Sequence, residues 1–455
     1  SSDVCSSDLL IMNYNEAVSL YQKSPTSETL KEVCRQLCSE LTLREKLKML
    51  SGRQFAQRNC YDLITKGKKY NHRPCLAGGV KRLGIPAIAF SDGPRGVVMG
   101  NSTCFPVSMA RGATFNDDLE YEVGTAIAKE AIAGDANYFA GICINLLRNP
   151  RWGRAQETYG EDPFLLGKMG AALTRAVQDN GVIACPKHFA CNSIENIRFS
   201  VDVHADEKTL QEVYFPHFKK CIDAGAMSIM GAYNLLRGEH CCESRYLLTD
   251  VLRGQWHFEG FAITDFLFAL RNGEKAIKAG MDVEMPMKIL YTALPIYLKS
   301  GKISQRDIDT AVQNVLAGLI KITPKIKRQS KDVIACKAHA MLAKKVACEG
   351  TVLLKNNGIL PLKNIKKIAV VGRYANKINV GDHGSSSVAS PYTVTPYEGL
   401  CNAFGKENVV LCESLDISSR LDEIKDCSCV LICVGSDYKQ EGENLANFSS
   451  NDDAD

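Results

Sequence analysis

Short apolar runs alternate with longer amphipathic stretches over the first three hundred residues of the chain. Each apolar run ends at polar or charged residues, and stretches with helical spacing lie between the runs, as at 118–133 and 207–225. Strands that alternate with helices indicate a parallel sheet. The runs that we predict as strands are Ile88–Phe90, Ile142–Ile144, Val182–Cys185, Ser228–Met230, Phe261–Ile263 and Met281–Val283.

Several such units over roughly 250 residues favour an α/β fold with a (β/α)8-type barrel, in which functional side chains follow the strands. The chain places Asp92, Lys187, His188, Tyr233 and Asp265 at such positions. Carboxylates together with basic and aromatic side chains are typical of a polar pocket that binds sugars. A doubly wound sheet has the same periodicity and remains the alternative fold.

A second α/β domain is predicted after the barrel. The basic stretch from Lys321 to Lys331 is interpreted as a solvated linker, and a helix at 333–349 leads into the apolar run Thr351–Leu354. Further buried strands are predicted at Ile368–Val371, Val409–Leu411 and Val430–Val434, the last at or near a sheet edge. We therefore expect an incomplete α/β sandwich at 346–455, a linker and connecting helix at 321–345, the barrel at 13–320 and a disordered or non-native prefix at 1–12.

The composition is that of a globular protein, with 45% hydrophobic and 23% charged residues. The net charge of +4 predicts no nucleic-acid partner, and no apolar run approaches the roughly 20 residues of a membrane span. The N-terminus lacks the pattern of a secretory signal. Many of the nineteen cysteines lie in apolar stretches (Cys143, Cys185, Cys348, Cys433), so we expect reduced, buried thiols and a cytoplasmic location.

Several common sites are not supported by the sequence. Val370-Val371-Gly372 follows a predicted strand, but no G-x-G-x-x-G follows it, and the Gly/Ser-rich loop at 381–387 lacks the ending of a phosphate-binding loop. There is no G-x-S-x-G, no CxxC and no HExxH, and the eight histidines are dispersed. We expect neither a metal nor a cofactor.

An ordered series of motifs carries a family resemblance. The motifs are Ser91–Gly96, Phe105–Pro106, Ala110–Phe115, Asn149–Arg154, Glu157–Pro163, Pro186–Phe189, Met230–Asn234, Gly260–Asp265, Gly280–Met285 and Glu349–Asn356. The series resembles the β-glucosidases of glycoside hydrolase family three, from about residue 40 to the end of the chain. The resemblance implies a barrel followed by an (α/β)6 sandwich, with the active site between them, and hydrolysis with retention through a covalent glycosyl-enzyme.

The resemblance also implies roles for individual residues. Asp265 matches the nucleophile, and Glu441 matches the acid/base, with Glu443 as the second choice. Lys187 and Arg198 are expected to keep a neighbouring carboxylate ionised. The residues expected to bind the sugar are Asp92, Arg154, Lys187, His188, Arg198, Met230, Tyr233, Phe266 and Ser385.

The sequence departs from the family pattern at some positions, and alternatives stay open. Phe266 stands where tryptophan is usual, Val98 where many members have arginine, and Asn444-Leu445 where Asp-Arg is common. We expect an exo-acting enzyme that acts on an oligosaccharide or an aryl β-glucoside. A β-xylosidase, an N-acetylglucosaminidase and an inactive sugar-binding fragment are the alternatives, and a homo-oligomer stays open. Asp92 favours glucose because family xylosidases tend to carry the longer glutamate there.

Overall fold

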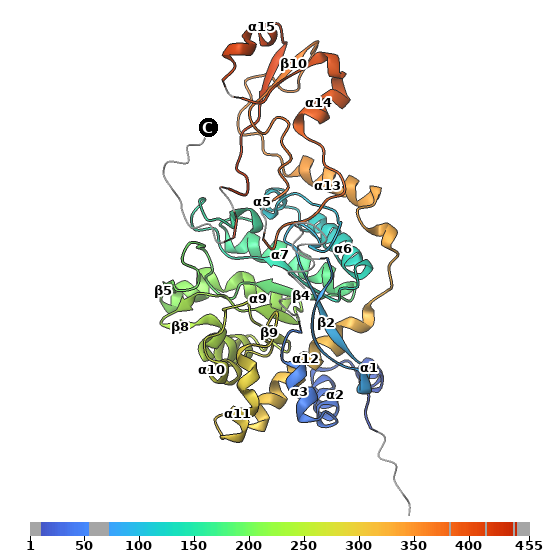
Figure 1. Ribbon diagram of the computed structural model, residues 1–455, viewed down its shortest axis with the longest axis vertical. Coiled ribbons are helices and arrows are strands. Elements are labelled where there is room, and N and C mark those ends of the chain that lie inside the picture. The colour runs from blue at the N-terminus through green and yellow to red at the C-terminus, as the bar shows by residue number, and fades with distance from the viewer. Residues whose placement is uncertain (1–10, 54–71, 382–383, 415, 440–441, 444–455) are drawn as a thin grey trace, which may run out of the picture.

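The computed structural model describes residues 11–53, 72–381, 384–414, 416–439 and 442–443. Most of the predicted prefix and the acid/base candidate Glu441 lie outside the described residues. A large domain forms the lower part of the molecule, and a smaller sheet domain stands above it (Figure 1). Two loops of the smaller domain descend to the larger one, where a strand-like bridge joins Asn101 to Ala389.

The large domain is built around a closed ring of strands. Strands β1 (Cys75–Val80), β2 (Ile85–Asp92), β3 (Tyr138–Cys143) and β4 (Ile183–Lys187) form one sheet, and β6 (Ser228–Met230) pairs in parallel with β9 (Phe261–Ile263). Isolated bridges close the ring: Phe189 with Gly231, Ile263 with Val283, Ser51 with Glu284, and Gly52 with Ala77. The predicted barrel is therefore confirmed, whereas the doubly wound sheet is wrong.

The strand β1 is an exception to the alternation of parallel strands and helices in the ring. β1 runs antiparallel to β2, because only the short turn Lys81–Leu83 connects them instead of a helix. Gly78 and Gly79 in β1 both have positive φ, and a Cβ at Gly79 would lie 3.0 Å from the backbone nitrogen of Ala87. Such a glycine-rich strand lacks the apolar run that marks the others. Its pairing orients the first part of the ring, ending at Asp92.

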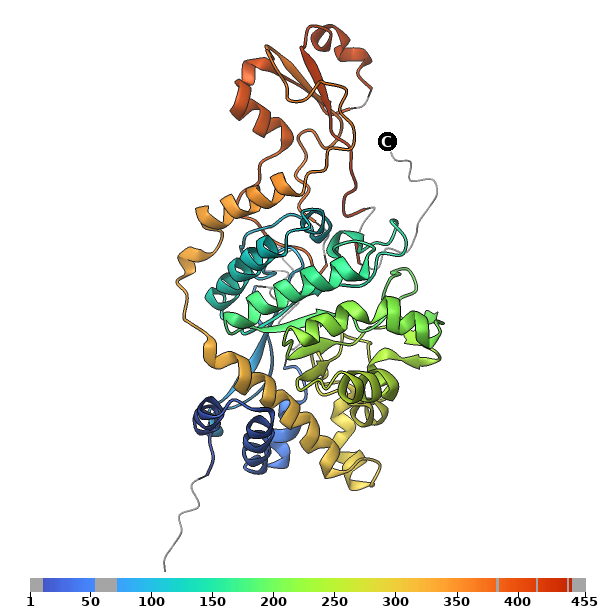
Figure 2. The same cartoon turned by 180° about the vertical axis from the view of Figure 1, so that it is seen from behind.

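Helices surround the ring, and α6 lies beside α7 on its outer face (Figure 2). Each long helix begins at a capping side chain: Asn116 caps α6, Asp162 caps α7 and Ser304 caps α12. The α-helices of this domain within the described residues are α1 (Tyr14–Lys23), α2 (Ser27–Ser39), α3 (Leu43–Met49), α5 (Ser108–Gly112), α6 (Asp117–Ala133), α7 (Pro163–Asp179), α8 (Glu207–Thr209), α9 (Pro216–Asp223), α10 (Gly273–Ala279), α11 (Leu294–Lys299) and α12 (Gln305–Ile322).

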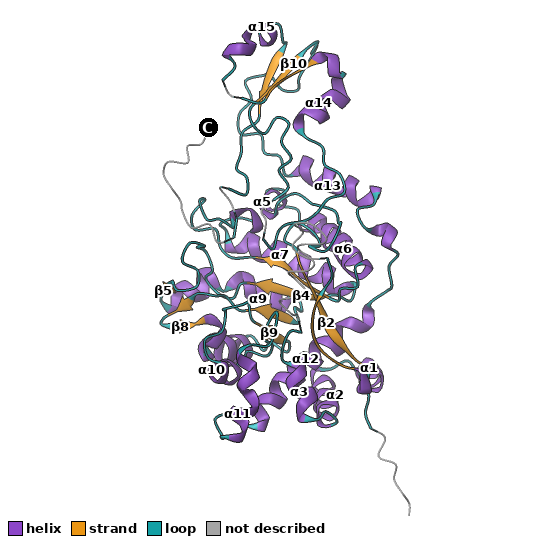
Figure 3. Cartoon of the chain, in the orientation of Figure 1, coloured by secondary structure: helices purple, strands orange, loops and turns teal. Residues whose placement is uncertain are grey.

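Two further features belong to this domain. Wider π-helical turns cover Leu210–Tyr214 and Tyr246–Gln255. A small sheet of β5 (Asp202–Val203), β7 (Leu235–Leu236) and β8 (Glu239–His240) lies at its side (Figure 3). None of the helices that the structure describes combines the length and the apolar character that a bilayer crossing requires.

The smaller domain follows the helix α13 (Lys337–Glu349). Its three described strands stand in the order β11 (Val409–Cys412), β10 (Ile368–Val371), β12 (Cys429–Ile432), all parallel, with helices α14 (Pro396–Phe404) and α15 (Leu421–Ile424) between them in the chain. Among the described strands β12 lies at a sheet edge, as predicted, but it is not the buried strand that was predicted: its residues Val430, Leu431 and Ile432 are 47%, 42% and 60% exposed, because no described element covers them.

Two further expectations of burial are wrong. Thr351–Leu354 forms no strand, and Leu354 is 91% exposed, because α13 ends at Glu349 and the chain then runs as an irregular loop. Among the cysteines, Cys143 and Cys185 are buried free thiols as expected, but Cys348 is exposed and Cys433 is only half-buried. Cys348 lies near the end of α13, and Cys433 comes directly after the exposed strand β12.

Candidate active site

A pocket of about 40 Å³ lies at the carboxyl ends of the ring strands, under the descending loops of the smaller domain. Asp92, Lys187 and Met230 are the last residues of β2, β4 and β6, and Asp265 comes two residues after β9. Since these strands run in parallel, their ends meet at one rim. The residues that line the pocket are Phe90, Asp92, Arg154, Lys187, His188, Met230, Tyr233, Asp265, Phe266, Ser385 and Glu443.

Asp265 has one fixed and one free oxygen. Its Oδ1 accepts a hydrogen bond from the backbone nitrogen of Phe266 (2.7 Å). Its Oδ2 is buried and has no hydrogen-bond partner among the described residues. Burial raises the pKa of Asp265, and the cations Arg198, Arg154 and Lys187 only limit the rise. Lys187 and Arg198 thus act to favour the ionised form of Asp265, in the expected direction, while burial acts against it.

Asp92 and Lys187 form a buried ion pair. The Lys187 Nζ lies 2.8 Å from Asp92 Oδ1, and the side chains are 2% and 5% exposed respectively. Burial raises the pKa of Asp92 to about 6, and Lys187 limits this rise. Asp92 is therefore an anion at neutral pH. A carboxylate in this position can accept hydrogen bonds from sugar hydroxyls.

His188 is a neutral ring whose tautomer follows from its neighbours. Its Nδ1 lies 2.9 Å from Asn145 Oδ1, which can only accept, so Nδ1 carries the proton. Its Nε2 then accepts from Arg154 Nη1 at 3.1 Å. Burial lowers the pKa of His188 well below its usual value, and the nearby Arg154 and Lys187 add to this. The 3.4 Å approach of Nε2 to Asp265 Oδ2 is therefore not an ion pair.

Arg154 and Arg198 are both buried and each has its own carboxylate. Arg154 forms a bidentate ion pair with Glu157, donating from Nε (3.0 Å) and Nη2 (2.7 Å). Arg198 Nη1 donates to Glu195 Oε2 at 3.0 Å, and its guanidinium lies 4.6 Å from the centre of the Tyr233 ring. Arg154 thus does not depend on Asp92 for an anionic neighbour. Each guanidinium is held rigidly at the pocket wall.

Glu443 enters the pocket from the smaller domain. Its Oε1 accepts from the backbone nitrogen of Ser385 (2.7 Å), and its two oxygens lie 3.8 Å from Arg154 and 3.7 Å from Arg198. Burial acts to raise the pKa of Glu443, but the two arginines and Ser385 overcome it and lower the pKa to about 2. In this arrangement Glu443 is a carboxylate.

Two glycines leave the space that the segment carrying Glu443 occupies. A Cβ at Gly384 would lie 2.7 Å from Glu443 Oε1, and a Cβ at Gly153 would lie 2.4 Å from the carbonyl oxygen of Gly442. Both contacts are closer than real Cβ atoms allow, so side chains at these positions would displace the segment. Gly153 therefore lets the barrel and the smaller domain meet at Gly442.

Aromatic rings lead from the pocket to the surface. Phe266 packs on Phe90, with 4.7 Å between the ring centres. On the other side the ring of Phe199 lies edge-on to Tyr233 at 4.7 Å, and Phe268 lies edge-on to Phe199 at 6.5 Å. Tyr233 is 4% exposed, Phe199 36% and Phe268 66%. This path offers an apolar surface that leads out of the pocket.

The structure brings together nearly all the predicted site residues. Ten of them line the pocket itself or touch it, and Arg198 lies directly behind Glu443 and Tyr233. Sequence reasoning missed the carboxylates Glu157 and Glu195 and the amide of Asn145, which hold Arg154, Arg198 and His188 in place at the pocket. Glu157 and Glu195 each lie three residues from the arginine that they bind, and that spacing was the available signal.

Family models match most of the chain. The model described as the glycosyl hydrolase family 3 N terminal domain matches residues 64–317, and the model of the family's C-terminal domain matches residues 351–455. The chain belongs to glycosyl hydrolase family 3. The two matched regions correspond to the barrel and the smaller sheet domain.

Relatives in the family are named β-glucosidases. Thermostable beta-glucosidase B of Acetivibrio thermocellus is 32% identical over 448 residues, covering 91% of this chain and 56% of the relative. The structure of beta-glucosidase 3B from Thermotoga neapolitana in complex with glucose has a TM-score of 0.75 at 29% identity, covering 86% of this chain and 56% of that one. The beta-glucosidase of Kluyveromyces marxianus in complex with glucose has a TM-score of 0.72 at 33% identity, covering 84% and 46%. The chain thus spans about half the length of the relatives that it matches.

Proposed function

We propose that this protein is a retaining, exo-acting β-glucosidase that removes terminal β-D-glucosyl units. The observation that carries the proposal is the free, buried Oδ2 of Asp265, which faces a pocket surrounded by groups that can bind hydroxyls. The names of the relatives support the same activity. A lone oxygen aimed into such a pocket is suited to attack on an anomeric carbon.

The reaction would proceed in two displacements. Asp265 Oδ2 forms a bond to the anomeric carbon while the bond to the leaving oxygen breaks, and that oxygen takes a proton from a carboxylic acid. Water then attacks the same carbon from the opposite side to Asp265, gives its proton to that carboxylate and releases glucose and the Asp265 carboxylate. Lys187 and Arg154 would hold the sugar hydroxyls during both steps.

We assign the acid/base role to Glu443, since its side chain lies in the pocket with Asp265. Two properties of the present arrangement mean that Glu443 must move before it can act as the acid. About 40 Å³ is far less than the 300 Å³ or more of typical ligand pockets, so its carboxylate fills part of the sugar's place. A pKa of about 2 also leaves no proton to donate.

Withdrawal of Glu443 would both make room for the sugar and raise the pKa of the carboxyl group. A carboxylate that leaves Arg154, Arg198 and the Ser385 nitrogen loses the contacts that lower its pKa, and the pKa rises toward the range of a general acid. The incoming sugar would then take over the hydrogen bonds of both arginines. Substrate binding would thus prepare the acid.

The choice of glucose over xylose rests on Asp92, whose short side chain leaves room for a hydroxymethyl group. The test is release of nitrophenol from aryl β-glucoside, β-xyloside and β-N-acetylglucosaminide by the full chain, with the first anomer of the product followed by NMR. We expect turnover of the glucoside with a β-product. A faster xyloside would favour the xylosidase, and glucose binding without turnover of any glycoside would favour the sugar-binding fragment.

A further inference from the structure

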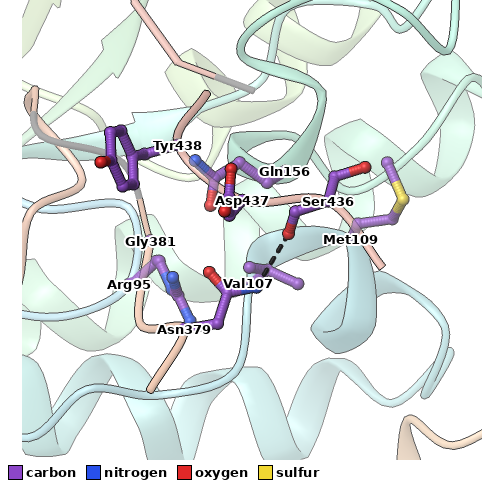
Figure 4. A pocket seen from close by; sticks show the side chains of 9 residues that line it. All are labelled: Arg95, Val107, Met109, Gln156, Asn379, Gly381, Ser436, Asp437 and Tyr438. Carbon is purple, nitrogen blue, oxygen red and sulfur yellow. Dashed lines mark hydrogen bonds between the residues drawn. The ribbon is translucent and has the colours of Figure 1, made fainter. Parts of the chain in front are cut away.

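A second cavity, of about 230 Å³, lies between the barrel and the smaller domain. It shares no lining residue with the catalytic pocket. The barrel contributes Arg95, Gln156 and Met109 to its wall, and the smaller domain contributes Asn379 and Asp437 (Figure 4). The cavity is thus a separate space at the domain contact.

Arg95 is a buried cation without a matching anion in the part of the chain that the structure describes. The residue is 8% exposed, its Nε has no hydrogen-bond partner, and it forms no ion pair with a described carboxylate. It approaches Gly381 so closely that a Cβ there would lie 2.5 Å from its Nη1. Burying an uncompensated charge is costly, and an anion that joins Arg95 would remove that cost.

A neutral polar side chain, that of Gln156, lines the same cavity. Gln156 is also 8% exposed, and its side-chain amide makes no hydrogen bond to another residue that the structure describes. An amide can donate hydrogen bonds to an oxygen and accept one from a hydroxyl. Arg95 and Gln156 together therefore offer several buried donors.

The lining residues from the smaller domain do not supply the missing negative charge. Asp437 is the carboxylate among the lining residues, and it is already paired with Lys377 and accepts from the backbone nitrogen of Lys439 (2.9 Å). The Asn379 amide donates to the carbonyl oxygen of Ser436 at 2.8 Å, the dashed line in Figure 4. Since Lys377 neutralises Asp437, the charge of Arg95 leaves the cavity with a net charge of +1.

We propose that this cavity binds a small oxyanion, a carboxylate or a phosphate, through Arg95 and Gln156. Guanidinium groups bind both oxyanions with paired hydrogen bonds, and the cavity has room for an anion as large as a sugar acid. Arg95 follows Asp92 by three residues, and Gln156 lies between Arg154 and Glu157. A bound anion would therefore brace the loops that also build the catalytic pocket.

The test is direct binding to the full chain at pH 7 and constant ionic strength, by calorimetry with phosphate and with gluconate. We expect saturable binding of at least one of them, and the one that binds identifies the class of ligand. Arg95→Gln should weaken it at least about tenfold, the size of a lost charged hydrogen bond. Arg151→Gln is the matched control, because it removes an exposed arginine nearby and should leave binding unchanged.

Three results would overturn the proposal. They are no saturable binding of either anion by the unaltered chain, equal binding by Arg95→Gln, and displacement of the anion by glucose, which would place it in the catalytic pocket. If Arg95→Gln fails to fold by circular dichroism, Gln156→Leu decides instead. That variant keeps the charge and removes the amide, so we expect binding several times weaker, and unchanged binding would contradict the assignment.

Discussion

Replacing Gly153 by alanine should damage the acid step while leaving the barrel intact. The added Cβ would lie 2.4 Å from the carbonyl oxygen of Gly442, and an ordinary contact begins near 3.4 Å, so the segment must retreat by about 1 Å. Gly153 does not have a positive φ, so alanine fits its own backbone. The strain therefore falls mainly on the neighbouring domain, and within the barrel only the Cγ of Glu195, at 3.3 Å, must shift slightly.

The retreat moves the residue that follows Gly442. Glu443 follows Gly442 directly, so its backbone also shifts by about 1 Å, and after it withdraws from Ser385, Arg154 and Arg198 its carboxyl group is displaced from the leaving oxygen. A misplacement of this size costs roughly 100-fold in rate, or about 2.7 kcal/mol. The loss should concentrate on substrates whose leaving group needs a proton.

The assay is kcat/KM for an alkyl β-glucoside and for a dinitrophenyl β-glucoside. We expect Gly153→Ala to lose about 100-fold on the first and much less on the second. Gly254→Ala is the control, since it makes the same change at an exposed site where the nearest atom is 3.4 Å away. Equal losses on both substrates, or full activity on the alkyl glucoside, would refute the reasoning.

Four further predictions follow from the site. Asp265→Asn should lower turnover by several orders of magnitude with the circular dichroism spectrum unchanged, since nothing replaces the nucleophile; retention of a few per cent of activity would exclude that role. Lys187→Met should destabilise the fold by about 3–5 kcal/mol in urea titration, and adding Asp92→Asn should restore most of it, because the buried pair becomes neutral; additive losses would contradict the pairing. Activity should fall as the pH drops below about 6, where Asp92 takes up a proton, and an acid limb with a much lower midpoint would separate Asp92 from sugar binding. Azide should rescue Glu443→Ala as a glucosyl azide; rescue of Glu441→Ala alone would move the acid/base to Glu441.

The sequence predicts those strands well whose side chains are buried on both faces. The runs Ser228–Met230, Phe261–Ile263 and Ile368–Val371 coincide with β6, β9 and β10. β1 was not predicted because its pairing depends on glycines rather than on an apolar run. Thr351–Leu354 has an apolar run and is nevertheless exposed, because the sequence does not show whether a second element covers it.

The candidate site also has parts that the sequence predicts and parts that it does not. Asp92 and Asp265 could be predicted as site residues because each comes shortly after a predicted strand. The neutral state of His188 and the rise in the pKa of Asp265 depend on burial and on neighbours far along the chain, which no local pattern contains. The position of Glu443 depends on a contact between two domains.

The most direct test of the proposed chemistry is to trap the covalent intermediate. The full chain is incubated with dinitrophenyl 2-deoxy-2-fluoro-β-glucoside, whose fluorine slows the second displacement, and the digested protein is examined by mass spectrometry. We predict one fluoroglucosyl group per chain, attached to Asp265. Hydrolysis of β-glucosides without any label, or with the label on another carboxylate such as Asp92, would contradict the assignment of Asp265 as the nucleophile.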